Sequence, residues 1–155
     1  MRIGIGFDFH IIKKKIPMYL GGIKITDEFG FFSNTDGDIL IHSIVDAILG
    51  AIGEKDIGEI FDDSWKEKSS TEILSFVKNI IEKSNYEILN IDAVIILEKP
   101  KISNYKEKII ENLSNLLDID KNKINLKAKT MERIGFIGKG KGGASIATVL
   151  VNEKR

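Results

Sequence analysis

The sequence predicts an α+β sandwich in which a mixed sheet lies on one side and helices lie on the other. Two observations predict it: residues 2–11 alternate in the manner of a strand, and residues 39–52 form a strongly apolar helical segment. Further segments of both periodicities alternate along the rest of the chain. At 155 residues and 43% hydrophobic content, the chain can bury a core, and we predict a single domain over residues 1–155.

Composition excludes several classes of function. Lys and Arg number 23 and Asp and Glu number 23, so the formal net charge is zero, which removes the broad positive field of a general nucleic-acid binder. There is no cysteine, so a zinc ion would be held by nitrogen and oxygen ligands. No apolar run approaches the roughly 18–20 residues that span a bilayer, and Met1 leads straight into a strand. We therefore predict a cytoplasmic protein with no nucleic-acid or membrane partner.

The first predicted strand covers residues 2–11. Apolar side chains alternate there with two glycines, Asp8 and His10, a period of two that is typical of a half-buried strand. Side chains two positions apart on a strand point to the same side and lie about 6.5–7 Å apart. The carboxylate of Asp8 and the imidazole of His10 can therefore reach one metal ion between them.

The helix at residues 39–52 begins after the acidic group of residues 34–38 and ends before Gly53, a suitable start and stop. Its polar exceptions are Asp38, His42 and Asp46, which repeat every four residues and share one stripe. A buried stripe of this kind needs partners. Asp38 or Asp46 could orient an imidazole of the metal site; the alternative is that the stripe faces solvent.

His42 is the only other histidine of the chain. With Asp8 and His10 it would give two nitrogen ligands and one oxygen ligand, with a fourth position open for water or substrate, a set suited to catalytic zinc. The alternative is structural: His10 as a hydrogen-bonded strand residue and His42 as a helix-face residue. Spacing alone leaves both interpretations open.

The remaining elements follow in order. A short hairpin is predicted at residues 18–25, and an irregular apolar segment at 27–35 must pack on something, such as a neighbouring subunit. An acidic loop at 56–65 either covers a site or is a structural turn. A capping box at Ser69 to Glu72 starts a second helix to residue 81, residues 88–97 form a central strand, and Ser103 caps a third helix to residue 117. Strands at 124–128 and 144–151 flank a glycine-rich loop.

That glycine-rich loop, residues 135–143, formally fits part of a phosphate-binding loop. Gly142 stands where Ser or Thr should bind magnesium, and a strand rather than a helix is predicted next. A nucleoside-triphosphatase is therefore disfavoured, although the loop amides and Lys139 could still meet an anionic ligand.

Six spaced motifs together resemble the 2-C-methyl-D-erythritol 2,4-cyclodiphosphate synthase family, over essentially the whole chain. They are Gly6-Phe7-Asp8-Phe9-His10, Asp36-Gly37-Asp38 followed by His42, Asp56-Ile57-Gly58, Pro100-Lys101, Thr130-Met131-Glu132, and the Gly135-Phe136 loop. The resemblance implies a ferredoxin-like α/β sandwich assembled as a homotrimer, with active sites between subunits. It implies a lyase of the non-mevalonate isoprenoid pathway that converts 4-diphosphocytidyl-2-C-methyl-D-erythritol 2-phosphate to the 2,4-cyclodiphosphate and releases CMP.

The resemblance also implies the site residues. Zinc, one ion per chain, would be held by Asp8, His10 and His42, and a second divalent ion, Mg²⁺ or Mn²⁺, by Glu132. Asn34 and Thr130 would act in catalysis as hydrogen-bond donors. The implied substrate contacts are Asp8, His10, Asn34, Thr35, Asp56, Ile57, Gly58, Phe61, Asp62, Asp63, Ser64, Trp65, Leu97, Pro100, Lys101, Ile102, Ser103, Lys129, Thr130, Met131, Glu132, Phe136 and Lys139.

Two positions depart from the family pattern. Asn34 stands where a histidine that contacts substrate phosphate is usual; Asn can donate a hydrogen bond but carries no charge. Lys139 stands where an arginine is usual beside a central cavity that can bind isoprenoid diphosphates; Lys keeps the charge but loses the bidentate fork.

Two other functions fit parts of the pattern. A zinc-dependent phosphohydrolase could use the same Asp-His-His set with bound water as nucleophile, and it would release free phosphate rather than a cyclic product. A non-catalytic metal- or nucleotide-binding trimer is suggested by Asn34, and it would not turn over the diphosphocytidyl substrate. The cyclase chemistry itself needs no protein nucleophile, because one phosphate of the substrate attacks the other.

Overall fold

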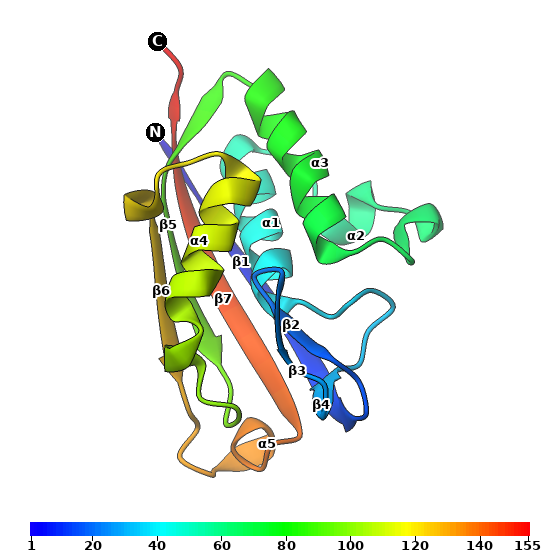
Figure 1. Cartoon of the computed structure of the whole chain (residues 1–155). Coiled ribbons are helices and arrows are strands. Elements are labelled where there is room, and N and C mark those ends of the chain that lie inside the picture. The colour runs from blue at the N-terminus through cyan, green and yellow to red at the C-terminus, as the bar shows by residue number, and fades with distance from the viewer.

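The computed structural model describes residues 1–155 and contains a five-stranded sheet with the order β4-β1-β7-β5-β6 (Figure 1). A separate two-stranded hairpin, β2-β3, lies beside it. The strands are β1 (Arg2–Lys14), β2 (Met18–Leu20), β3 (Ile23–Thr26), β4 (Phe29–Phe31), β5 (Tyr86–Ile96), β6 (Ile124–Lys129) and β7 (Gly142–Glu153).

Helices α1, α3 and α4 gather on one side of the sheet (Figure 1). The helices are α1 (Ile39–Ile52), α2 (Ile57–Ile60), α3 (Ser70–Lys83), α4 (Lys106–Leu117) and α5 (Gly135–Gly138), with 3₁₀ turns η1 (Asp63–Trp65), η2 (Ile102–Asn104) and η3 (Lys121–Lys123). Strand β5 pairs parallel with β6 and antiparallel with β7, and β1 pairs antiparallel with β7 and β4. The predicted α+β sandwich with a mixed sheet is confirmed.

Helix α1 lies directly on β1 because two glycines leave room for it. A Cβ atom at Gly4 would come within 1.9 Å of the Ala47 carbonyl oxygen, and one at Gly6 within 1.9 Å of the Ser43 carbonyl oxygen. No side chain fits at either position, so the helix backbone approaches the strand backbone closely. This approach carries His42, on the same helix, to the strand that bears Asp8.

The predicted half-buried strand is confirmed in β1, but its buried face is the one with the glycines. The apolar side chains Ile3, Ile5 and Phe7 are 70%, 70% and 60% exposed on the opposite face. The helices cover only one side of the sheet (Figure 1). The isolated chain therefore presents a continuous apolar strand face to its surroundings.

The predicted ends of α1 and the predicted start of α3 are confirmed, whereas α3 runs to Lys83 rather than to residue 81. The Asp38 carboxylate caps α1 by accepting from the Ile41 amide at 3.0 Å, and it also accepts from the amides of Gly21 and Gly22. Gly53 ends the helix in the left-handed conformation, with φ 83°. Ser69 and Glu72 form the predicted capping box of α3. Asp38 thus ties the β2-β3 turn to the start of α1.

The structure corrects four local predictions. The segment 27–35 is not wholly irregular, because it contains β4, and its Phe31 is buried in the core of the same chain. The acidic segment 56–65 is not a plain loop, because it contains α2 and η1. Ser103 caps no helix: it lies in η2, and α4 begins at Lys106 without a side-chain cap. The glycine-rich loop contains the short helix α5.

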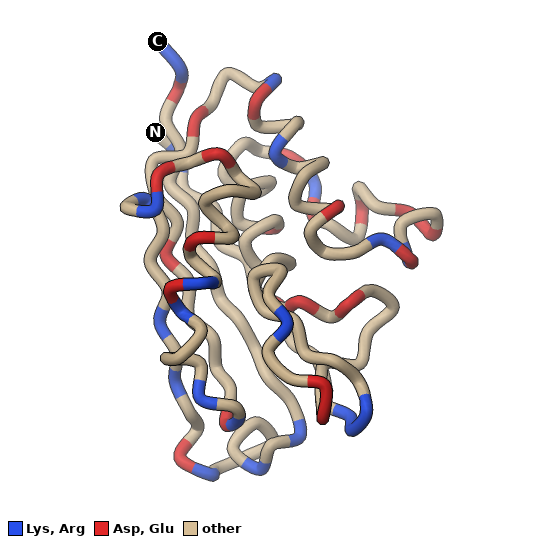
Figure 2. The backbone as a smooth tube through the Cα atoms, in the orientation of Figure 1, with Lys and Arg blue, Asp and Glu red and all other residues tan.

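Positions of charged residues of both signs are spread along the chain (Figure 2). This distribution agrees with the net charge of zero. No helix of the structure has both the length and the apolar character required to cross a membrane.

Candidate active site

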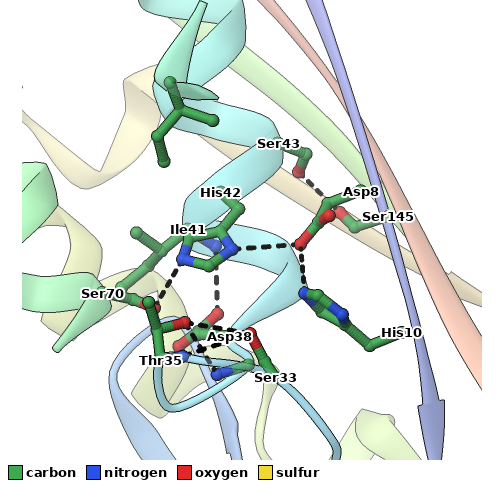
Figure 3. A network of polar contacts seen from close by, with 12 residues as sticks. Asp8, His10, Ser33, Thr35, Asp38, Ile41, His42, Ser43, Ser70 and Ser145 are labelled. Atoms are coloured by element: carbon green, nitrogen blue, oxygen red, sulfur yellow. Dashed lines mark hydrogen bonds and ion pairs between the residues drawn. The ribbon is translucent and has the colours of Figure 1, made fainter. Parts of the chain in front are cut away.

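Asp8, His10 and His42 come together where β1 meets α1 (Figure 3). One ligand atom of each lies within 4.8 Å of the others. Asp8 Oδ2 is 3.1 Å from His42 Nδ1 and 3.2 Å from His10 Nε2. The Asp8 carboxylate therefore lies close to both imidazoles, so one ion could contact all three side chains.

These separations suit a tetrahedral zinc ion. Ligands that are 2.0–2.1 Å from zinc at tetrahedral angles lie about 3.3 Å from one another, close to the two distances measured here. The three side chains would supply three ligands to such an ion and leave a fourth position for water or substrate, as in catalytic rather than structural zinc sites. The donor set of two nitrogens and one oxygen thus fits the metal that the sequence suggested.

The electrostatics of the triad favour an ionised Asp8 carboxylate. Burial raises the pKa of Asp8, but the hydrogen bonds and charges of His10 and His42 outweigh it and lower the pKa to about 2. Burial lowers the pKa of His42, but the hydrogen bond with Asp8 and the charges of Asp8, Asp38 and Asp36 outweigh it, so the pKa is raised. A carboxylate that stays ionised at neutral pH is a suitable metal ligand.

The other nitrogen of His42 faces Ser70 rather than either aspartate of the helix stripe. Its Nε2 is 3.0 Å from Ser70 Oγ, and Ser70 in turn contacts Asp36. Asp38 is engaged as the cap of α1, and Asp46 accepts from the amide of Ile57 at 2.8 Å. The prediction that Asp38 or Asp46 orients an imidazole is therefore wrong, and so is the alternative that the stripe faces solvent, since His42 is buried.

A pocket of about 170 Å³ opens beside His42. Seven residues that the sequence implied as substrate contacts line it together with Lys66 and Ile73: Asn34, Thr35, Ile57, Gly58, Phe61, Asp62 and Trp65. Its volume is below the roughly 300–1,000 Å³ of complete ligand pockets. The pocket can accommodate part of a nucleotide-like ligand next to the metal triad.

Three implied residues of the same region lie off the pocket wall. Asp56 caps α2 by accepting from the Glu59 amide at 2.9 Å, and Asp63 and Ser64 lie exposed in η1. The segment is anchored by aromatic contacts: the ring centroid of Trp65 lies 4.5 Å from that of Phe61 and 5.1 Å from that of Phe76. Trp65 is therefore half-buried.

The second group of implied residues lies at the adjoining ends of β5 and β6. The Leu97 amide donates to the Lys129 carbonyl at 2.9 Å, and the Met131 amide donates to Glu98 at 3.1 Å. The Thr130 hydroxyl donates to Glu132 at 3.3 Å. Leu97 and Ile102 are buried and Pro100 is half-buried, whereas Lys101, Ser103, Lys129, Thr130, Met131 and Glu132 are exposed.

Phe136 and Lys139 belong to α5 and the residues that follow it. The ring of Phe136 lies 5.9 Å from that of Phe9. Lys139 lines a second cavity, of about 460 Å³, with Glu98, Lys99, Arg133, Gly138 and Gly140. Sequence reasoning did not single out Glu98, Lys99 or Arg133, because none belongs to a recognisable motif.

The two groups do not meet within one chain. Phe9, next to Asp8, pairs with Ala144, which pairs with Ile96, which pairs with Lys129. Three inter-strand spacings of about 4.8 Å place the triad and the Thr130 segment roughly 14 Å apart. The two groups therefore lie on β1 and at the end of β6, which are separated by β7 and β5 in the sheet.

Comparison with known protein families places these features in context. A profile of the YgbB family matches residues 1–152. The chain is 45% identical to 2-C-methyl-D-erythritol 2,4-cyclodiphosphate synthase of Halothermothrix orenii, with 97% of this chain and 93% of the relative covered. It is 47% identical to the bifunctional enzyme IspD/IspF of Aliarcobacter butzleri, where the match covers 94% of this chain but only 40% of the longer relative.

Solved structures agree with the sequence matches. The chain superposes on IspF of Plasmodium falciparum, solved as a CDP complex, with a TM-score of 0.91 at 43% identity, covering 99% of this chain and 97% of the other. It superposes on the bifunctional IspDF of Campylobacter jejuni with a TM-score of 0.94 at 36% identity, covering 99% of this chain and 42% of the other.

Proposed function

This chain belongs to the YgbB family, and on that premise we infer that it is a 2-C-methyl-D-erythritol 2,4-cyclodiphosphate synthase of the non-mevalonate isoprenoid pathway. It converts 4-diphosphocytidyl-2-C-methyl-D-erythritol 2-phosphate to the 2,4-cyclodiphosphate and releases CMP, and it is a lyase. The observation that carries the inference is the Asp8-His10-His42 triad beside a pocket lined by Asn34 and residues of the α2 segment.

The reaction needs little covalent chemistry from the protein. An oxygen of the 2-phosphate attacks the β-phosphorus, the bond from that phosphorus to the bridging oxygen breaks, and CMP leaves with the bridging oxygen. The substrate supplies both nucleophile and leaving group. The protein must align the two phosphates and neutralise their charge, which explains why a chain without cysteine and with two histidines suffices.

Metal ions held by the protein would supply the positive charge that neutralises the phosphates. We assign Asp8, His10 and His42 to zinc and Glu132 to a second divalent ion, Mg²⁺ or Mn²⁺. When bound, such ions stabilise phosphate charge as Lewis acids. The triad is half-buried between β1 and α1. An ion held there would interact more strongly with phosphate charge, because less water screens the interaction.

The neighbouring residues would orient the substrate. Asn34 lies on the pocket wall next to His42, where its amide can donate to a phosphate oxygen as the transition state gains charge. Gly58, on the same wall, and Asp56 are assigned to the ribose. Thr130, with the other residues of the segments 97–103 and 129–132, is assigned to the cytidine and phosphate side of the substrate. Phe136 and Lys139 are also assigned as substrate contacts, and the ammonium of Lys139 could meet an anionic group.

We propose that a second copy of the chain completes each site. One substrate must touch both the triad and the Thr130 segment, which lie roughly 14 Å apart on one sheet. A neighbour could bring its own Thr130 segment to the triad. The exposed apolar face of Ile3, Ile5 and Phe7 is a surface that assembly would bury. We infer a homotrimer with three sites between subunits; the cytoplasmic location and the single domain stay predictions.

Product analysis tests this function. Purified protein with Zn²⁺ and Mg²⁺ is incubated with the diphosphocytidyl substrate, and the products are separated and followed by ³¹P NMR. We expect equal amounts of the cyclic diphosphate and CMP. Free phosphate would instead support a zinc-dependent phosphohydrolase, and substrate binding without turnover would support a non-catalytic nucleotide-binding protein.

A further inference from the structure

We propose that Ser70 and Asp36 form a hydrogen-bond relay that holds His42 in the tautomer with its hydrogen on Nε2, so that Nδ1 is the atom presented to the metal. The inference rests on the proposed role of His42 as a metal ligand. Ser70 and Asp36 would be positioning residues, since Ser70 contacts the nitrogen of His42 that faces away from Asp8 (Figure 3) and Asp36 contacts Ser70.

The direction of the hydrogen bonds follows from what each group can donate. Ser70 Oγ is in short contact with Asp36 Oδ1 and lies 3.0 Å from His42 Nε2. An ionised carboxylate only accepts, and a hydroxyl has one hydrogen to give. The Ser70 hydrogen therefore goes to Asp36, and the hydroxyl oxygen accepts from His42, which requires a hydrogen on Nε2.

Asp36 is held firmly in its accepting role. Besides the Ser70 hydroxyl, it accepts from the Ser70 amide at 2.9 Å and from the Asp38 amide at 3.3 Å. Three donors directed at one carboxylate occupy it as an acceptor. The relay thus ties three segments together: the loop before α1, the first residue of α3, and the second turn of α1.

No competing partner is available to Nε2. Ser70 is fully buried and His42 is 9% exposed, so bulk water does not replace the relay. Asp46 is directed to Ile57 and Asp38 to the end of its own helix. The hydroxyl of Ser70 is therefore the only group within hydrogen-bond distance of this nitrogen.

The relay determines what the other side of the ring can do. A neutral imidazole with its hydrogen on Nε2 has a lone pair on Nδ1, and Nδ1 faces the triad 3.1 Å from Asp8 Oδ2. In the opposite tautomer, Nδ1 would donate to Asp8, and this hydrogen would have to leave before a metal could bind. Outer partners of this kind typically change metal affinity 10- to 100-fold.

The chain offers a rescue variant and a matched control. Ser70→Ala removes the hydroxyl and leaves the ring nitrogen without a partner, whereas Ser70→Thr keeps a hydroxyl. Ser69→Ala changes the neighbouring serine, which caps α3 through the Glu72 amide and makes no contact with His42. Ser69→Ala should weaken the helix cap without touching the relay.

Two measurements test the proposal, and neither depends on activity. Long-range ¹H–¹⁵N NMR of the metal-free wild-type protein, at a pH where the ring is neutral, should show an unprotonated Nδ1 and a protonated Nε2 for His42. Zinc titration against a competing chelator should show affinity reduced 10- to 100-fold in Ser70→Ala, largely restored in Ser70→Thr and unchanged in Ser69→Ala.

Two results would overturn the relay: a wild-type His42 with its hydrogen on Nδ1, or a folded Ser70→Ala that binds zinc as tightly as the wild type. Failure of the proposed function would be visible separately. A protein that keeps the Nε2 tautomer and the zinc pattern but makes no cyclic diphosphate would retain the relay and lose the assigned reaction.

Discussion

The two halves of the proposed site are built in contrasting ways. The metal half, around Asp8 and His42, is assembled inside one chain by a strand and a helix in close contact. The loop half, around Thr130 and Glu132, is exposed and makes its polar contacts mainly with its own neighbours. Within one chain the three proposed zinc ligands already lie together, whereas the segment with Thr130 and Glu132 lies exposed at the end of another strand.

The largest effect should come from breaking the metal half at its helix ligand. His42→Ala removes one of three ligands, and loss of several kcal/mol of charge stabilisation corresponds to a rate reduced by about a thousandfold or more. Bound zinc measured by atomic absorption should fall in parallel. Asp46→Asn, on the same helix stripe but directed to Ile57, should retain zinc. A zinc-free His42→Ala with full activity would refute the assignment.

The close approach that builds the metal half can be broken without touching a ligand. In Gly6→Ala the new Cβ would meet the backbone of α1 at 1.9 Å, so the helix must move; we expect a loss of about 3 kcal/mol in unfolding free energy and weaker zinc binding. Gly50→Ala is the control, since its Cβ would meet only Gly4 at 3.9 Å, and it should be neutral or stabilising. Urea unfolding measures the stability of both variants. Equal unfolding free energies for Gly6→Ala and Gly50→Ala would contradict this packing argument.

Substitution of Asn34 tests whether catalysis needs a further positive charge beside the metal ligands. If Asn34 acts as a neutral donor, Asn34→Ala should raise the activation barrier by about 1–3 kcal/mol and so lower kcat/KM roughly 5- to 150-fold, and Asn34→His should change little at neutral pH. An imidazolium would behave differently, because histidine titrates near 6.5. A rate gain in Asn34→His that is larger at pH 6 than at pH 8 would show that a positive charge is useful here.

The smallest effect concerns the charge of Asp8 in the metal-free protein. Its pKa is lowered to about 2, below the unfolded value of about 3.9, so its ionisation stabilises the fold above about pH 4 and this contribution disappears as the pH falls through 2. The unfolding free energy of the wild type relative to Asp8→Asn should therefore shrink by about 1–2 kcal/mol on acidification.

The sequence was sufficient for the fold class and for the elements with strong periodicity. Residues 39–52 were predicted as a helix to the residue, because an acidic cap and a glycine stop mark both ends. The apolar side of β1 could not be assigned to solvent or core, because alternation does not say which face is covered. Only the fold reveals that the glycine face receives α1.

The site was predictable where ligands lie close in sequence or share a motif. Asp8 and His10 are two residues apart, and their shared strand face follows from the period of two. Ser70 was recognised only as part of a helix start, because its contact with His42 joins residues 28 positions apart. Such long-range contacts carry no local signal, so the partner of His42 was wrongly sought on its own helix.

The most direct test of the account is complementation between two inactive variants. Asp8→Ala loses a proposed zinc ligand and Glu132→Ala loses the proposed ligand of the second ion, so each variant alone should be inactive. If sites form between neighbouring chains of a trimer, unfolding and refolding the two together should give about a quarter of the sites one intact copy of each half, and activity should return to about that fraction. Co-refolding with the double variant Asp8→Ala/Glu132→Ala in place of Asp8→Ala should restore nothing. Mixed chains that stay as inactive as the separate variants would contradict a site shared between two copies.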